Sequence, residues 1–356
     1  MSLRKGLAIF LMLTLGVSAF IVGRSMDRHA VIAFMNIRKT KILHILLTVI
    51  VAWCFDAARF CMTARAMGHR IPFLRGVQLT WLHYFGCAIT PMQVGGGPFQ
   101  VYVLYKSGIP VGSGIAITLV RTLFSTFLLS IAAPAAFFLV PQFAEGGVLV
   151  KGVFCYVGIL SAVMWTVFVL SIVKADAIKH FCSWVLVLLK RVHFFNKMRV
   201  MHAARIIYTE IDSYSQNVKH MVGPGRKYFA AAFLLSVCQL VTVFSVLPQL
   251  MSAVGLYAEY FHVILAQAMF MFILYFIPTP GASGVAEGGG AAIFSLLMPE
   301  NMTGIMAVLW RFFTEYLAIF MGCIVAIRMI GWGRAERIIS CGQDEVICSE
   351  EVSDEK

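Results

Sequence analysis

Charged residues are scarce in this chain. Asp, Glu, Lys and Arg make up 13% of its 356 residues, whereas 60% are hydrophobic, and the mean hydropathy is +0.84. Soluble globular domains carry about a quarter charged residues, so this composition excludes that class. The sequence predicts an all-α, polytopic integral membrane protein. A chain of 356 residues is long enough for about six to eight membrane helices but not for an additional soluble catalytic domain.

The motifs of several functional classes are also missing. The nine cysteines include no C-x-x-C pair, which favours buried, reduced thiols over a zinc site or a disulfide framework. No G-x-x-x-x-G-K-[ST] loop occurs, so direct use of ATP is not expected. His69 and His83 lack partners at metal-binding spacing. We therefore expect neither a metal nor a cofactor.

Six apolar runs are long enough to span a membrane. They cover residues 7–23, 42–60, 114–140, 148–173, 228–254 and 304–330. Two more apolar stretches, 77–106 and 259–298, are interrupted by Pro and Gly, which predicts that each forms two half-length helices in a re-entrant hairpin. Residues 1–340 are thus expected to form one transmembrane domain. The acidic tail 341–356 is expected to be disordered.

Basic residues orient the predicted spans. Residues 174–227 carry ten Lys or Arg against three Asp or Glu, and the 61–76 loop holds three arginines without an acid. The positive-inside rule places both segments, and both termini, in the cytoplasm of a multi-pass protein of the inner (plasma) membrane. The basic 24–41 segment contradicts this arrangement. We interpret it as a helix lying on anionic headgroups.

The net charge of +12 does not indicate a nucleic-acid-binding protein. The basic residues lie beside predicted spans, so membrane-surface phosphates are the expected partners. The basic amphipathic segment 174–227 either sets topology and solubility or recognises a lipid or a protein, and the sequence leaves both readings open. It also leaves open whether the chain forms a homo-oligomer.

The two interrupted stretches match each other. Gln78 lies 13 residues before Pro91, and Arg121 follows that proline by 30 residues; Gln267 lies 13 residues before Pro280, and Arg311 follows by 31. The text around the arginines, "LVRTLF" and "LWRFFT", is also parallel. The predicted topology makes the copies inverted in the membrane. Inverted copies with broken helices indicate a transporter binding site near the midplane, although both breaks could instead serve helix packing.

Backbone groups freed by these breaks are tolerated at membrane depth only when they are buried in protein or line a wet cavity. The amides that start each second half-helix carry partial positive charge, which predicts an anionic ligand. Beyond the glutamines and arginines, the candidate site residues are Thr90, Pro91, Gly95, Gly96, Gly97 and Gln100 in the first copy, and Thr279, Pro280, Gly281, Ser283 and Gly284 in the second.

Few ionisable side chains fall at membrane depth, where each needs a partner or a function. Asp56 and Arg59 are three residues apart, so a local ion pair or snorkelling explains them better than a substrate role does. Arg311 and Glu315 are four apart and could also form a pair, which favours a structural role for Glu315. Arg121 has no acid on its own helix. Either Glu287 pairs with it across the bundle, or an anionic ligand does.

Arg121 and Arg311 are predicted to bind the headgroup or to act in gating, because a guanidinium holds phosphate through two hydrogen bonds. Glu287 is predicted to act in gating or proton coupling, with an ion pair that merely holds the hairpin as the alternative. Gln78 and Gln267 are predicted to hydrogen-bond between helices and to contact a headgroup.

The motifs "TPMQVGGGPFQVYVLYKSG" and "PTPGASGVAEGGGAAIFSLLMP", with "LWRFFTEYLAIFMG", resemble those of the lysyl-phosphatidylglycerol synthase transmembrane family. This family comprises the flippase-like domain of the bacterial multiple peptide resistance factor and its stand-alone relatives. The resemblance covers nearly the whole chain and implies a membrane domain that moves phospholipids between leaflets. Two departures stand out. No aminoacyl-transferase domain follows, and the first glycine motif has Gly96, Gly97 and Gln100 where many relatives carry an acid.

The leading hypothesis is therefore a lipid translocase, not an enzyme, that moves an anionic or amino-modified phospholipid or lipid-linked headgroup between leaflets. An intramembrane transferase that uses a lipid-phosphate donor is one alternative, since it needs the same phosphate-binding cavity. A transporter of a small soluble anion is the other.

Overall fold

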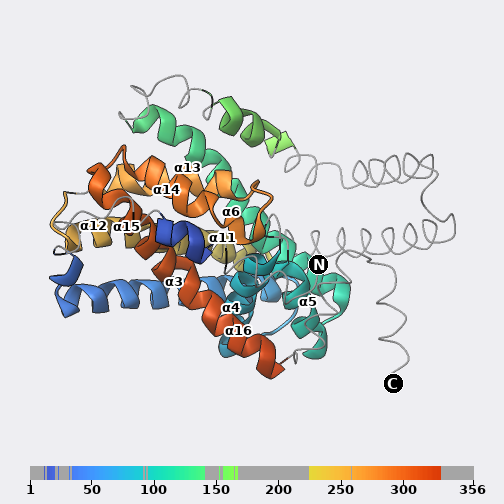
Figure 1. Ribbon diagram of the computed structural model, residues 1–356. Coiled ribbons are helices and arrows are strands. Elements are labelled where there is room, and N and C mark those ends of the chain that lie inside the picture. The colour runs from blue at the N-terminus through green and yellow to red at the C-terminus, as the bar shows by residue number, and fades with distance from the viewer. Residues whose placement is uncertain are drawn as a thin grey trace, which may run out of the picture.

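The computed structural model describes residues 34–90, 95–140, 155–163, 224–257 and 259–329, together with 14–20 and the positions 12, 23, 32, 93, 152, 165 and 166. Regular structure in these residues is helical, with no strand among them (Figure 1). The all-α class is confirmed. Pro91, most of the basic segment 174–227 and the tail 341–356 lie outside the described residues.

Among the described residues, four helical stretches are long and apolar enough to cross a membrane. They are α3 (Lys39–Ala66), α6 (Val111–Leu139), α11 (Arg226–Phe244) continued by α12 (Val246–Ala253), and α15 (Glu300–Arg311) continued by the π-helical turn η3 (Phe312–Tyr316) and α16 (Leu317–Met329). They correspond to four of the six predicted spans. The other two, 7–23 and 148–173, lie largely outside the described residues, although 14–20 and 155–163 are helical.

Each interrupted stretch forms two short helices that fold back on each other. The first pair is α4 (Phe73–Ile89) and α5 (Gly96–Lys106); the second is α13 (Tyr260–Leu274) and α14 (Val285–Phe294), with the 3₁₀ turn η2 (Pro280–Ala282) between them. Gln100 Nε2 on α5 donates to the Leu79 carbonyl on α4 at 2.9 Å. The Phe270 ring on α13 packs against Gly289 and Phe294 on α14. The proline and glycine breaks therefore produce hairpins, as predicted.

The two halves of the bundle are related by an inverted repeat. Helix α3 packs along α11 and α12 in the opposite direction, because Thr48 near its start hydrogen-bonds Gln249 of α12 at 3.1 Å, while Ala66 at its end contacts Gly225 before α11. Packing between the halves is reciprocal: α4 lies against α16, and its counterpart α13 lies against α6, the counterpart of α16. The packing of the helices thus shows the inverted relation that the matched motifs predict.

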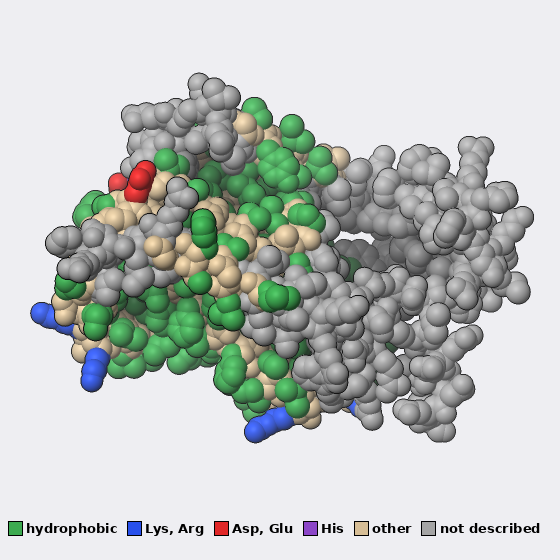
Figure 2. Space-filling view, viewed as in Figure 1, with side chains coloured by type: hydrophobic (Ala, Val, Ile, Leu, Met, Phe, Trp, Pro, Cys, Tyr) green, Lys and Arg blue, Asp and Glu red, His purple; other side chains and the backbone are tan. Residues whose placement is uncertain are grey.

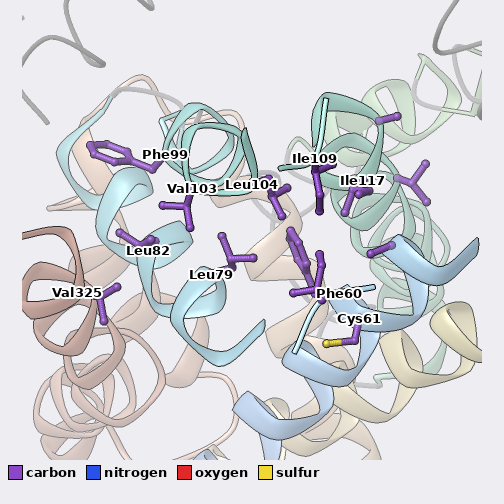
Figure 3. Packing of buried hydrophobic residues seen from close by; sticks show 14 of the residues in the cluster. Phe60, Cys61, Leu79, Leu82, Phe99, Val103, Leu104, Ile109, Ile117 and Val325 are labelled. Carbon is purple, nitrogen blue, oxygen red and sulfur yellow. The ribbon is translucent and has the colours of Figure 1, made fainter. Parts of the chain in front are cut away.

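Three clusters of buried apolar side chains hold the bundle together. Figure 3 shows the first, in which Phe60 of α3, Leu79 of α4 and Leu104 of α5 converge with Ile117 of α6. Because lipid tails are as apolar as these side chains, close van der Waals packing rather than a hydrophobic driving force favours the assembly. On the face shown in Figure 2, the described part of the surface carries many hydrophobic side chains and few charged ones.

One end of the bundle gathers basic residues. Arg75 Nη1 at the start of α4 donates to Ser107 Oγ after α5 at 3.1 Å, and the start of α11 contacts the end of α3. The α3–α4 connection, the end of α5 and the start of α11 therefore lie together. They carry Arg65, Arg70, Arg75, Lys106, Arg226 and Lys227. This arrangement agrees with the prediction that these segments share one side of the membrane.

The close contact between α16 and α4 predicts that replacing Gly322 by a larger residue destabilises the protein. A Cβ at Gly322 of α16 would lie 2.1 Å from the Trp81 carbonyl oxygen and 2.8 Å from Phe85 Cβ on α4. We expect Gly322→Ala to lower the free energy of unfolding by about 1–3 kcal/mol through overpacking. Thermal unfolding in detergent measures this.

Gly158→Ala is the matched control. A Cβ at Gly158 meets no atom within 4 Å, so this variant should be neutral or slightly stabilised by the higher helix propensity of alanine. Equal melting temperatures for the two variants would contradict the α4–α16 contact.

Candidate functional site

The first break, between α4 and α5, is held by the Thr90 side chain. Thr90 Oγ1 donates to the Gly86 carbonyl at 2.9 Å and accepts the Gly95 N–H at 2.8 Å. Gly96 faces α4 so closely that a Cβ there would lie 2.3 Å from His83 Nδ1, whereas a Cβ at Gly97 would meet no atom within 4 Å. The glycines therefore differ: Gly96 permits the hairpin to close, and Gly97 is sterically open.

The second break, between α13 and α14, is also closed by hydroxyl groups. Thr279 Oγ1 donates to the Ser283 carbonyl at 3.1 Å, and Ser283 Oγ donates to the Pro280 carbonyl at 2.8 Å. Gly281 and Gly284 have φ of 59° and 85°, a left-handed conformation that costs glycine little. Thr14 of the N-terminal segment donates to Ser283 Oγ at 3.2 Å, so this segment packs on the break.

The amides at the starts of the two second half-helices are engaged within the chain. The Gly95 N–H before α5 donates to Thr90, as above, and the Gly284 N–H before α14 donates to Glu287 Oε2 at 2.6 Å. One amide at each start, that of the residue before the helix, is therefore capped by a local side chain, because a broken helix inside a membrane protein needs its donors satisfied. That the other amides at these starts face an anionic ligand stays a prediction.

A first charged cluster, the Asp56 cluster, joins α3 to α6. Arg121 Nε donates to Asp56 Oδ1 at 3.2 Å, and Arg59 also pairs with Asp56 and donates from Nη1 to Ser125 Oγ at 2.6 Å. The three charged side chains are buried. The Asp56–Arg59 pair is confirmed, but Arg121 shares it. Two guanidinium groups against one carboxylate leave a formal charge of +1.

A second charged cluster, the Glu287 cluster, joins α14 to α15 and η3. Arg311 lies with Nε 3.3 Å from Glu287 Oε1 and Nη1 3.1 Å from Glu315 Oε1. Arg311 Nη2 donates to the Gly281 carbonyl in the break, and Tyr316 Oη donates to Glu287 Oε1 at 2.7 Å. The local Arg311–Glu315 pair is confirmed. Two carboxylates against one guanidinium leave a formal charge of −1.

The two arginines hold matching positions but have different partners. Arg121 lies ten residues after the first residue of α6, and Arg311 lies eleven after the first residue of α15. The alternative that Glu287 pairs with Arg121 across the bundle is wrong: Arg121 pairs with Asp56, and Glu287 with Arg311. Asp56 and Arg59 are thus the residues that sequence reasoning left out of the site. The sequence did show that Asp56 and Arg59 are charged residues at membrane depth. Nothing in the sequence, however, linked Asp56 to Arg121, which lies 65 residues further along the chain.

The matched glutamines behave differently in the two copies. Gln267 is buried, and its Nε2 donates to the Phe244 carbonyl of α11 at 2.7 Å, so it joins helices as predicted. Gln78 is half-buried. Within the first hairpin Gln100 is the residue that joins the helices, through its bond to Leu79. A headgroup contact for these glutamines stays a prediction.

Two tyrosines link the surroundings of the charged clusters. Tyr84 of α4 interacts electrostatically with Asp56 and Arg121 of one cluster and with Glu315 of the other, and Tyr275 at the second break does so with Arg121 and Glu315. Both tyrosines are partly exposed. The breaks, the arginines and these hydroxyl groups therefore belong to one central region of the bundle. Among the described residues, no group of three or more His, Cys, Asp or Glu side chains is arranged to hold a metal ion.

Removing Asp56 is expected to destabilise the protein strongly. Asp56→Asn would leave Arg59 and Arg121 buried side by side without a counter-charge, and breaking a buried ion pair from one side costs about 3–5 kcal/mol. Thermal unfolding in detergent should show this loss.

The double variant Asp56→Asn/Arg121→Gln restores the formal charge of +1, so it should recover part of the lost stability. Exposed Glu300→Gln serves as the neutral control. A double variant no more stable than Asp56→Asn would show that charge pairing is not what Asp56 contributes.

Comparison with known proteins supports a single family assignment. The family model described as the lysylphosphatidylglycerol synthase TM region matches residues 7–322. A UPF0104 membrane protein of Archaeoglobus fulgidus is 24% identical over 277 residues, which cover 76% of this chain and 81% of that protein. The family match includes both hairpins and both charged clusters. The chain belongs to the lysylphosphatidylglycerol synthase TM-region family.

Proposed function

We propose that this protein is a lipid translocase that moves a phospholipid or lipid-linked molecule with a phosphate headgroup across the plasma membrane, without chemical conversion of the lipid. One observation carries the proposal: two inverted repeats place a broken-helix hairpin and a buried arginine in matching positions, within one central region. Inverted repeats with discontinuous helices at their interface are the architecture of transporters that expose a central site alternately to each side.

The Asp56 cluster is the proposed headgroup-binding half of this region. Its formal charge of +1 attracts a phosphate, and Arg59 Nε has no hydrogen-bond partner among the described residues although it is buried. Guanidinium groups bind phosphate through two parallel hydrogen bonds. Asp56 keeps both arginines paired before a headgroup arrives, which avoids the cost of an uncompensated buried charge. A headgroup phosphate would exchange with Asp56 for the same donors.

The Glu287 cluster is the proposed gate. Arg311 connects Glu287 on α14 to the Gly281 carbonyl inside the break, and Glu287 caps the first amide of α14. This single network fixes the shape of the second hairpin. A change in the pairing of Arg311 would alter the break directly, because this arginine contacts both the Gly281 carbonyl within the break and Glu287 on the helix that follows it.

Transport by purified protein in proteoliposomes tests the proposal. Wild-type protein should accelerate the exchange of a fluorescent anionic phospholipid between leaflets, measured by chemical quenching of the outer leaflet. Arg121→Ala should reduce the rate about tenfold or more, because hydrogen bonds to a charged group contribute about 1.5–3 kcal/mol. Glu287→Gln should also reduce it, by loosening the second break.

Arg226→Ala, at an exposed arginine at the start of α11, is the matched control and should transport normally. Arg121→Lys separates charge from geometry: it should retain only part of the activity if bidentate binding matters. Three results would reject the proposal: transport unchanged in folded Arg121→Ala, uptake of a water-soluble anion without lipid movement, or a chemically altered lipid.

A further inference from the structure

The Glu287 cluster has an unbalanced charge at membrane depth. Its three charged side chains are Glu287, Arg311 and Glu315, and one guanidinium cannot neutralise two carboxylates. A net charge in the interior of a membrane domain is costly, and two carboxylates that share one arginine repel each other. One bound proton would remove both penalties. The question is which carboxylate carries it.

Glu287 is the less accessible of the two carboxylates, because both of its oxygens already accept hydrogen bonds. Oε2 accepts the Gly284 N–H at 2.6 Å, and Oε1 accepts the Tyr316 hydroxyl at 2.7 Å and lies 3.3 Å from Arg311 Nε. A proton on either oxygen would compete with these neighbours. The Glu287 side chain is also fully buried, with 0% exposure, so a proton has no direct route to it.

Glu315 has the opposite surroundings. It pairs with Arg311 through Oε1 alone, and its side chain keeps 10% of its surface exposed while that of Arg311 keeps none. Glu315 Oε2 can therefore accept a proton without displacing the hydrogen bond from Arg311, which goes to Oε1. The ionisable groups that interact electrostatically with Glu315 are Arg311 on α15, Glu287 on α14, Tyr84 and Cys87 on α4, Tyr275 after α13 and Tyr316 in η3. Arg311 is the only cation in that set.

We propose that Glu315 is a proton-binding site, and that the proton taken up there is coupled to movement of the lipid. This inference rests on the proposed function for the coupling but not for the proton site itself. Protonation of Oε2 makes the cluster neutral and weakens the hold of Glu315 on Arg311 Nη1. Arg311 then pairs with Glu287 and the Gly281 carbonyl alone.

The position of Glu315 connects its protonation state to the second hairpin. Glu315 lies within η3, where the backbone departs from the α-helix as a π-helical turn between Arg311 and α16. Such single π-helical turns occur frequently at functional sites. Arg311 in turn contacts the carbonyl of the second break. The protonation state of Glu315 therefore reaches the hairpin through one shared guanidinium.

Infrared spectroscopy of the full-length protein in nanodiscs tests the proton site without any transport measurement. The wild-type protein should show the C=O stretch of a protonated carboxylic acid, and Glu315→Gln should lose one such component. Glu300→Gln, at an exposed residue at the start of α15, should keep it. The proposal is overturned if the component persists in Glu315→Gln. It is also overturned if Glu315→Gln does not fold, because the amide reproduces the neutral carboxyl.

Proteoliposomes with the membrane potential clamped test the coupling. With one proton per lipid, a gradient of one pH unit should shift the wild-type lipid distribution between leaflets by a factor of about ten. Glu315→Gln should still equilibrate the lipid but ignore the gradient. A wild-type distribution that ignores the gradient overturns the coupling. Absence of any lipid movement, with the infrared component lost in Glu315→Gln, would refute the proposed function and leave the proton site standing.

Discussion

The structure depends on keeping broken backbone and charged side chains paired inside a membrane domain. Arg311 shows how one side chain meets both demands, since it joins Glu287, Glu315 and the Gly281 carbonyl of the second break. Water cannot satisfy these groups at membrane depth, so each must find its partner in the chain. The break supplies an acceptor for the arginine, and the arginine stabilises the break. Neither would be tolerated alone.

The two repeats solve this problem in different ways. In the first, the break is closed by uncharged groups, chiefly Thr90, while Arg121 pairs with Asp56 on the neighbouring helix α3. In the second, the hydroxyl groups of Thr279 and Ser283 also close the break, and the charged side chains of Glu287 and Arg311 bond to it in addition. The inverted scaffold is therefore symmetric in its helices and asymmetric in its charges. A positive cluster on one side and a negative cluster on the other can serve different steps, which a strictly symmetric pair of sites could not.

This asymmetry gives the proposed transport cycle a physical basis. The positive cluster suits an anionic headgroup, and the negative cluster suits a proton and adjoins the second break. Tyr84 and Tyr275 interact electrostatically with charged residues of both clusters, so the two clusters lie near each other. The N-terminal segment also belongs to this region, since Thr14 contacts Ser283 at the second break.

The membrane class, the four long helices described here, the two hairpins and their inverted relation could be predicted from the sequence. These follow from apolar run length, from proline and glycine as helix breakers, and from spacing, all of which act locally along the chain. The pairs Asp56–Arg59 and Arg311–Glu315 were predictable for the same reason, because residues three or four apart share a helix face.

Which acid neutralises which arginine depends on how the helices pack. Asp56 and Arg121 lie on different helices, as do Glu287 and Arg311, and sequence spacing carries no information about contacts between helices. The side-chain caps at the two half-helix starts could not be predicted for a related reason. Capping by Glu287 and Thr90 depends on side-chain direction within a tight turn, and that direction is fixed only when the hairpin is packed.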